Sequence, residues 1–463
     1  MASVRRRRVL ATLSSAALSA TAGCTELLGD GSDEAATPES DAPETIEEAA
    51  ILFVEDLAAD RIETAYDRLR SDAQVETDLG ELERIWMGYT AVGGAFESVV
   101  DTDFRFESTH NALDVTMAFD RTTDVLRVLV DADLEIAGLY FNGEYESPAY
   151  VDADAIAEAD VTLEPWGAIE SPPANSCPLD GRLTTPIEED DVPGAVLVHD
   201  SGRNDMNYWR PGGGTRAFQD LAEGLATRGI ATLRYDERTF ACPMDVPAED
   251  HTLDAVTADD ALVAIERLRD VEGVDPDRIV VVGLGLGGMA APRIADRDGN
   301  LAGVVALAAP GRPFHEVILD GLEHRVTVGE YEWNRRALQY ERWQTEVERI
   351  RAGDYEPDER LVGKPGAFWK SLDAYDHVET ARAIDEPLFF LQGGRDFEVT
   401  VEDDLERWRS ELADRPATTI ETYDELNHLF MPGSGPSVGF EYSVRNNVAE
   451  RVVDDVADWI DGH

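Results

Sequence analysis

Hydrophobic runs and amphipathic stretches alternate along the chain from about residue 160 to residue 463. The predicted strands lie at 194–199, 229–235, 278–283, 302–307, 388–392 and 418–423, and the predicted helices include 216–227, 253–268 and 448–460. This alternation predicts a mostly parallel sheet with helices on its faces. We therefore predict an α/β fold for residues 160–463.

A long interval at about 311–385 separates two of these strands. It contains Trp333, Trp343 and Trp369 among many charged residues. Long insertions in such folds are usually lids or binding loops. We predict a helical cap over the functional site.

Residues 44–150 carry a different pattern, which predicts a separate α+β unit. Helical periodicity at two stretches precedes three strand-like stretches, in the order 46–57, 61–69, 113–119, 125–130 and 134–141. Helices before a curved antiparallel sheet resemble the small cone-shaped domains of the cystatin-like or NTF2-like type. The unit has no Cys/His cluster or carboxylate pair that suggests chemistry, so we expect a binding or structural role with an unknown ligand.

The first 24 residues have the pattern of an export signal. Arg5–Arg8 form a basic segment, and a small-residue apolar stretch too short to span a membrane continues to Ala22. The run Arg6–Leu10 resembles a twin-arginine signal. Thr21–Cys24 resembles a lipobox, which makes Cys24 the lipidated first residue of the mature protein.

The resemblance implies an exported protein, lipid-anchored to the outer face of the cytoplasmic membrane. Residues 25–43 are rich in Asp, Glu, Gly, Ser, Thr and Pro and predict an acidic flexible tether. A plain cleaved signal with an incidental cysteine stays open as the alternative.

Acidic residues dominate the charge of the chain. Asp and Glu number 95 against 40 Lys and Arg, which gives a formal net charge of −55. The acids are spread along the chain, which favours a halophilic surface in concentrated salt, where charges are screened over about 3 Å. An acidic binding surface is the alternative. The negative electrostatic field of this net charge excludes nucleic acid as a partner, and membrane contact is expected only through the lipid anchor.

Export changes the expected state of the two remaining cysteines. Cys177 and Cys242 would lie in an oxidising compartment and allow only one pairing. A disulfide between them is the first interpretation, and two free structural thiols are the second.

The most informative motif follows a β-branched run at 279–282 and reads Gly283-Leu284-Gly285-Leu286-Gly287. It resembles the Gly-x-Ser-x-Gly nucleophile elbow of α/β-hydrolases, in which a strand turns sharply into a helix. Gly285 stands at the serine position, so the nucleophile position is degenerate.

Gly283, Gly285 and Gly288 also fit the Gly-x-Gly-x-x-Gly spacing of a dinucleotide-binding loop. Ala308 and Ala309 stand at the next strand end, where that motif requires an acidic residue, so the match is weak. No cofactor is predicted, and no metal signature is found.

Further segments extend the hydrolase resemblance over roughly residues 160–463. They are His199–Asp205, Phe218–Leu225, Leu233–Thr239, Ala291–Ala295, Leu391–Asp396, Leu426–Phe430 and Gly433–Tyr442. These segments are similar to those of a group of bacterial esterases related to the dienelactone hydrolase and prolyl oligopeptidase branches of the α/β-hydrolase superfamily.

The resemblance implies a role for each matching position. Asp396 takes the position of the triad acid and His428 that of the general base, in the chain order of α/β-hydrolases. Asp200, Ser201 and Leu286 take the positions that form the oxyanion loop. Ordinary loop residues are the alternative interpretation of Asp396 and His428.

Three departures from the family pattern affect the chemistry. Gly285 has no oxygen to attack a carbonyl carbon, and Leu284 replaces a histidine common before the serine. Asp200 replaces a glycine in the oxyanion loop, where a carboxylate would repel a developing oxyanion. Loss of the nucleophile typically costs about 10⁶ in kcat.

Two function classes remain. The first is a surface-anchored pseudoenzyme descended from carboxylic-ester hydrolases, which binds a small molecule, an ester-like ligand or a protein in the old cleft. The second is a residual or active carboxylic-ester hydrolase, in which His428 and Asp396 activate water or an unrecognised nucleophile acts.

Overall fold

The computed structural model describes residues 42–463, except 108–109, 142, 165–176, 188–189, 211, 213, 245 and 329–334. The predicted export signal, the lipidation position Cys24 and nearly all of the predicted tether lie outside the described residues. In the part that is described, no helix is both long and apolar enough to cross a lipid bilayer.

Four helices precede a four-stranded antiparallel sheet in the N-terminal region. The elements are α1 (Ile46–Ala58), α2 (Ile62–Asp67), α3 (Ala73–Glu76), α4 (Leu79–Gly93), β1 (Phe96–Glu107), β2 (His110–Phe119), β3 (Thr123–Val130) and β4 (Ile136–Phe141). The strands pair in chain order, β1-β2-β3-β4. The predicted helices and strands all correspond to observed elements, whereas β1 had not been predicted because its apolar positions alternate with many charges.

Side-chain caps and an apolar core explain these elements. Thr45 and Asp78 accept hydrogen bonds from backbone N–H groups in the first turns of α1 and α4, at 3.1 and 2.8 Å. Phe53 of α1 is fully buried, and Trp86 of α4 packs against Phe119 of β2 with ring centroids 5.9 Å apart. This region therefore has a hydrophobic core of its own.

An eight-stranded sheet forms the centre of the remaining chain. Its strands are β5 (Ile156–Leu163), β6 (Leu179–Pro186), β7 (Val192–Val198), β8 (Ala231–Tyr235), β9 (Val274–Leu284), β10 (Gly303–Leu307), β13 (Leu388–Gly393) and β14 (Thr418–Tyr423). The order across the sheet is β14-β13-β10-β9-β7-β8-β6-β5. The six strands from β14 to β8 are parallel, and β6 and β5 are antiparallel additions at one edge. The predicted α/β class is confirmed.

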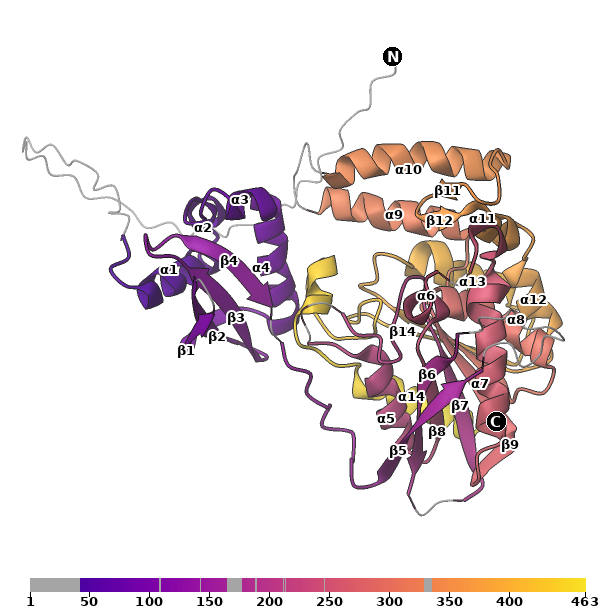
Figure 1. The fold of residues 1–463 in the computed structure, drawn as a ribbon. Coiled ribbons are helices and arrows are strands. Elements are labelled where there is room, and N and C mark those ends of the chain that lie inside the picture. The colour runs from indigo at the N-terminus through magenta and orange to yellow at the C-terminus, as the bar shows by residue number, and fades with distance from the viewer. Residues whose placement is uncertain are drawn as a thin grey trace, which may run out of the picture. The chain divides into compact units, whose positions relative to one another are not determined.

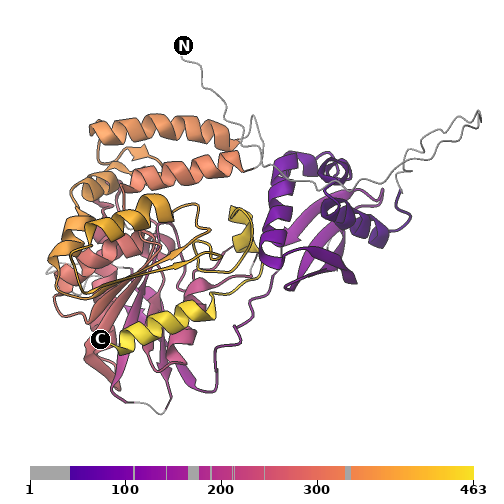
Figure 2. The same cartoon turned by 180° about the vertical axis from the view of Figure 1, so that it is seen from behind.

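Helices cover both faces of this sheet (Figures 1 and 2). The helical elements outside the cap are α5 (Ala217–Ala226), α6 (Arg238–Ala241), η1 (Ala248–Asp250), η2 (Asp254–Ala258), α7 (Asp259–Arg269), α8 (Leu286–Asp298), η3 (Val401–Leu405), α13 (Glu406–Glu411), η4 (Gly439–Ser443) and α14 (Glu450–Asp461). Helices α7 and α8 pack together, and α5 packs with α14. Helix α14 buries one apolar face, from Val452 to Ile460, against the sheet layer.

The interval predicted as a cap contains four helices and a short hairpin. They are α9 (Phe314–Thr327), α10 (Arg335–Ala352), β11 (Arg360–Leu361), β12 (Lys364–Pro365), α11 (Gly366–Asp373) and α12 (His377–Ala383). Helices α9 and α10 lie side by side in both views. The two-stranded hairpin had not been predicted, because two-residue strands leave no periodicity to detect.

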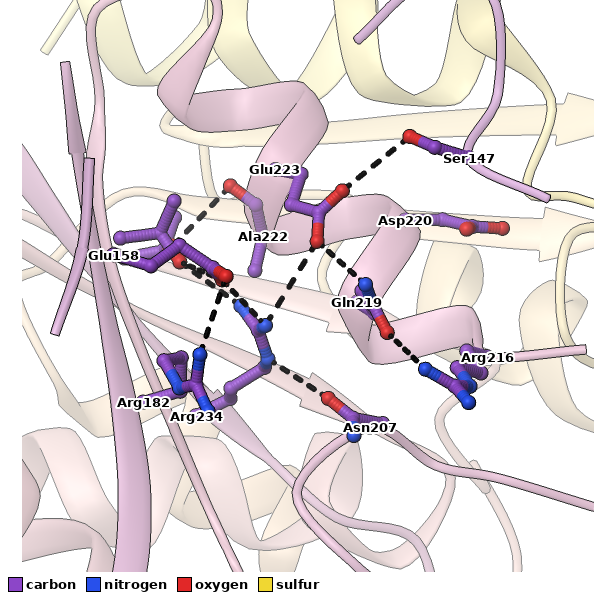
Figure 3. A network of polar contacts seen from close by, with 12 residues as sticks. Ser147, Glu158, Arg182, Asn207, Arg216, Gln219, Asp220, Ala222, Glu223 and Arg234 are labelled. Atoms are coloured by element: carbon purple, nitrogen blue, oxygen red, sulfur yellow. Dashed lines mark hydrogen bonds and ion pairs between the residues drawn. The ribbon is translucent and has the colours of Figure 1, made fainter. Parts of the chain in front are cut away.

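A buried arginine ties the antiparallel edge strands to helix α5 (Figure 3). Arg234 of β8 is 3 % exposed and lies 2.8 Å from Glu158 of β5 and 4.0 Å from Glu223 of α5. It also donates hydrogen bonds to Thr184 of β6 and to Asn207, at 2.9 and 3.1 Å. Because a buried charge is costly without partners, this network requires β5, β6 and α5 to be in place together.

Cys177 and Cys242 form a disulfide in the structure, with Cα atoms 6.3 Å apart. Cys177 lies just before β6, and Cys242 directly follows the last residue of α6. The disulfide closes a loop of 65 residues that includes β6, β7 and β8.

Candidate active site

Strand β9 turns into helix α8 at Gly285, which has φ +53° and ψ −116°. This positive φ is strained for a residue with a side chain and relaxed for glycine. Gly285 donates its N–H to the carbonyl of Leu307 at 2.9 Å, which fixes the turn against β10. The backbone of the elbow is therefore present without the nucleophile that it would present in a serine hydrolase.

The carboxylate of Asp200 fills the space beside Gly285. Asp200 follows β7, and its Oδ1 accepts a hydrogen bond from the N–H of Leu286 at 2.7 Å. A β carbon on Gly285 would overlap this Oδ1 and would lie 2.9 Å from the β carbon of Asp200. Leu286 N–H is the donor that would be expected to stabilise an oxyanion. In this structure the carboxylate of Asp200 already accepts its hydrogen bond.

The structure brings together His428 and Asp396. His428 follows β14 and Asp396 follows β13, and Nδ1 of the histidine lies 2.8 Å from Oδ2 of the aspartate. Asp396 also accepts hydrogen bonds from the N–H groups of Glu398 and Val399 at 2.8 and 3.1 Å and from the side chain of Gln392 at 2.9 Å. These bonds fix the carboxylate, which in turn orients the imidazole.

The other ring nitrogen of His428 faces Asp200, with Nε2 3.5 Å from Oδ2. Burial alone would lower the pKa of His428, but the charge of Asp396 and the contact with Asp200 outweigh it and raise this pKa well above its ordinary value. Burial opposes ionisation of Asp200 as well, yet His428 and the backbone N–H groups of Leu286 and Ser201 hold its pKa below the usual range. Both shifts favour the charged forms, a protonated imidazole beside a carboxylate, over the neutral imidazole that a general base requires.

These groups open onto a cavity of about 690 Å³. One wall is apolar and comes from the cap: Phe314, Val317, Ile318 and Leu322 of α9 and Trp343 of α10. The rest of the lining is mixed and includes the charged side chains of Arg210, Arg325, Lys364 and Glu398. The cavity lies at the carboxyl ends of the parallel strands, where open α/β sheets bind ligands.

Sequence reasoning missed the charged residues of this cavity other than Asp200 and His428, among them Glu398, Arg325 and Lys364. Glu398 lies two residues after Asp396 and forms an ion pair with Arg325. Lys364 is half-buried, and desolvation lowers its pKa, while the charges of Glu237 and Asp200 oppose that shift. Lys364 is one of only two lysines in the chain, and this rarity is the one sequence feature that could have marked it as a site residue. Glu398 and Arg325 have no such feature, because their places in the site depend on loop conformation.

Comparison with known proteins agrees with this architecture. Residues 195–438 match the model of the alpha/beta hydrolase family. The chain is 32 % identical over 418 residues to Esterase EstD of Thermotoga maritima, and the alignment covers 89 % of this chain and 95 % of that protein. Because 418 residues exceed the hydrolase region, the similarity extends into the N-terminal region.

Solved esterases are similar at lower identity. Esterase Est22 is 16 % identical, with a TM-score of 0.43, over 68 % of this chain and 83 % of that one. Est1E of Butyrivibrio proteoclasticus is 13 % identical, with a TM-score of 0.41, over 65 % and 97 %. From the family match and the relative with 32 % identity, we conclude that this chain belongs to the α/β-hydrolase family.

Proposed function

We propose that this protein is a ligand-binding descendant of carboxylic-ester hydrolases that no longer transfers acyl groups through a serine. The observation that carries the proposal is the position of Asp200. Its carboxylate occupies both the space of a side chain at residue 285 and the N–H of Leu286 that would stabilise an oxyanion. Acyl transfer depends on that electrostatic stabilisation, and removal of one donor alone costs about 10²–10³ in kcat.

Direct activation of water by His428 is the competing function. Two features disfavour it: the raised pKa of His428 favours the protonated imidazole over the neutral form that a general base requires, and the negative charge of Asp200 faces the place where an oxyanion would form. A binding role uses the cavity as it is. The apolar wall on α9 and the cations Arg210 and Lys364 suit an ester-like small molecule with an apolar body and a carbonyl or carboxylate group.

We further propose that this cleft is displayed outside the cell by the lipid on Cys24. The basic segment and the lipobox-like residues before Cys24 support this localisation.

Four proteins test the loss of catalysis: wild type, Gly285→Ser, Asp200→Gly and the double variant. Each is incubated in molar KCl with a fluorophosphonate probe and with p-nitrophenyl acetate. We expect label at residue 285 and ester hydrolysis only in the double variant, because only glycine at residue 200 clears the overlap and frees Leu286 N–H. Adding His428→Ala to the double variant should abolish both signals.

Two results would contradict the proposal. Hydrolysis by wild type at the rate of the double variant would show that another nucleophile operates. Label on the Gly285→Ser single variant equal to that on the double variant would show that Asp200 does not block the elbow.

A further inference from the structure

Three side chains meet where the nucleophile of a serine hydrolase would act. Asp200, Glu398 and His428 each offer one donor atom, and these atoms lie within 4.8 Å of one another. They come from the loops after β7, β13 and β14, so the sheet holds all three loops in place. The 3.5 Å between His428 Nε2 and Asp200 Oδ2 is close to the separation of two neighbouring ligands that are each about 2.0–2.2 Å from a metal ion.

His428 supplies an independent sign of an absent partner. Its side chain is 5 % exposed, and Nε2 makes no hydrogen bond with any residue that the structure describes. Its Nδ1 is held by the carboxylate of Asp396 at 2.8 Å. A histidine whose ring is held by a carboxylate through one nitrogen is the usual arrangement of a metal ligand, because the carboxylate fixes the ring and increases its basicity. Nε2 would bind the metal in its deprotonated form, so metal binding would release a proton from His428.

The carboxylates also have oxygen atoms left to bind a cation. Asp200 uses Oδ1 for Leu286 N–H, and Oδ2 is the atom that faces His428. Glu398 uses Oε1 for Arg325, which leaves Oε2. With Asp396, three carboxylates lie beside one histidine, whereas Arg325 pairs with Glu398 and Lys364 interacts with the charge of Asp200. The carboxylates would attract a divalent cation to this point.

We propose that Asp200, Glu398 and His428 bind one divalent transition-metal ion at the base of the cavity, with Asp396 as the residue that orients His428. One imidazole nitrogen and two carboxylate oxygens suit Zn²⁺, Co²⁺ or Mn²⁺ better than Ca²⁺, which takes oxygen ligands alone. Three protein ligands leave a coordination position open toward the cavity, where an oxygen atom of a bound ligand would complete the shell. The sequence carried no metal signature because the three ligands are far apart in the chain. This site does not depend on the function proposed above.

The test uses chelator-treated, full-length protein in molar KCl, titrated with Co²⁺ and followed by its visible d–d absorption. Calorimetric titrations with Zn²⁺ and with Ca²⁺ accompany it. We expect one Co²⁺ per chain, with the increased absorption of a site that has fewer than six ligands. Glu398→Gln and Asp200→Asn should each weaken binding at least tenfold, and Asp396→Asn should weaken it about 10–100-fold through the orientation of His428.

Glu402→Gln is the matched control, since Glu402 is an exposed acid four residues from Glu398 and outside the cluster. It should leave the affinity for Co²⁺ unchanged. Circular dichroism in the absence of metal verifies that each variant is folded. The proposal is wrong if binding is not saturable, if only the spectrum of the aqueous ion appears, or if folded Glu398→Gln binds as tightly as Glu402→Gln. Each of these results would mean that Co²⁺ binds only the acidic surface.

Discussion

The overlap between a side chain at residue 285 and Asp200 predicts an energetic coupling that stability measurements can detect. Gly285→Ala adds a β carbon at φ +53°, where an L residue pays about 1–2 kcal/mol of backbone strain. The added carbon also displaces the carboxylate of Asp200 from Leu286 N–H, and a lost hydrogen bond to a charged group costs about 1.5–3 kcal/mol. The single variant should therefore lose roughly 3–5 kcal/mol of unfolding free energy.

Asp200→Gly breaks the same hydrogen bond by another route. In the double variant that bond is lost once instead of twice, so the double variant should be more stable than the sum of the two single effects by about 2 kcal/mol. The extra chain entropy of a glycine at residue 200 occurs in both Asp200→Gly proteins and cancels in this difference.

Urea denaturation in molar KCl measures the cycle, and Gly299→Ala provides the control. Gly299 follows the last residue of helix α8 at φ +73°, and a β carbon there would have nothing within 4 Å. Backbone strain alone should therefore lower the unfolding free energy of this variant. If the effects of Gly285→Ala and Asp200→Gly add within about 0.5 kcal/mol, the two residues are not in contact and the reasoning fails. The same conclusion follows if Gly285→Ala costs no more than Gly299→Ala.

Four further predictions address other parts of the molecule. Burial raises the pKa of Asp220 to about 7. The stability that the protonated carboxyl contributes is therefore complete below the ordinary carboxyl pKa and is lost as pH rises through about 7. Asp220→Asn should reduce the fall in melting temperature between about pH 5 and pH 8. Changing Cys177 and Cys242 to serine should lower the unfolding free energy by about 4 kcal/mol for a 65-residue loop, and non-reducing mass spectrometry should find the two linked in wild type; complete labelling of both thiols in native protein would refute this. A net charge of −55 should make the melting temperature rise markedly between dilute buffer and molar KCl, whereas a flat response would mean that acids and arginines are already compensated. Cys24→Ala should release the protein from membranes or leave uncleaved precursor, and unchanged membrane partition would refute the lipid anchor.

The sequence was sufficient to predict the central strands and the order of the site residues. Runs such as 279–282 are buried on both faces of the sheet, so their apolar character is continuous and visible without a structure. Asp396 and His428 could be predicted because the resemblance to α/β-hydrolases assigns these positions to the acid and the base, and both follow strands of the parallel sheet.

Interactions across the fold could not be predicted in this way. Strands β5 and β6 are rich in polar residues, and two of these, Glu158 and Thr184, bond to Arg234 of β8 in the same sheet. Asp200 was recognised as a departure from the family pattern, but its hydrogen bond to Leu286 depends on a side-chain rotamer. Sequence spacing contains no information about that rotamer.

The position of Asp200 also restricts the mutational routes open to this lineage. A serine regained at residue 285 while Asp200 remains would meet an occupied space and an occupied backbone donor, so it would lower stability without yielding a nucleophile. The change at residue 200 must come first, and taken alone it removes a charged hydrogen bond and brings no catalytic gain. Under the loss of catalysis proposed above, selection for activity therefore would not favour the first step, and the present form of the site would resist reversal by single substitutions.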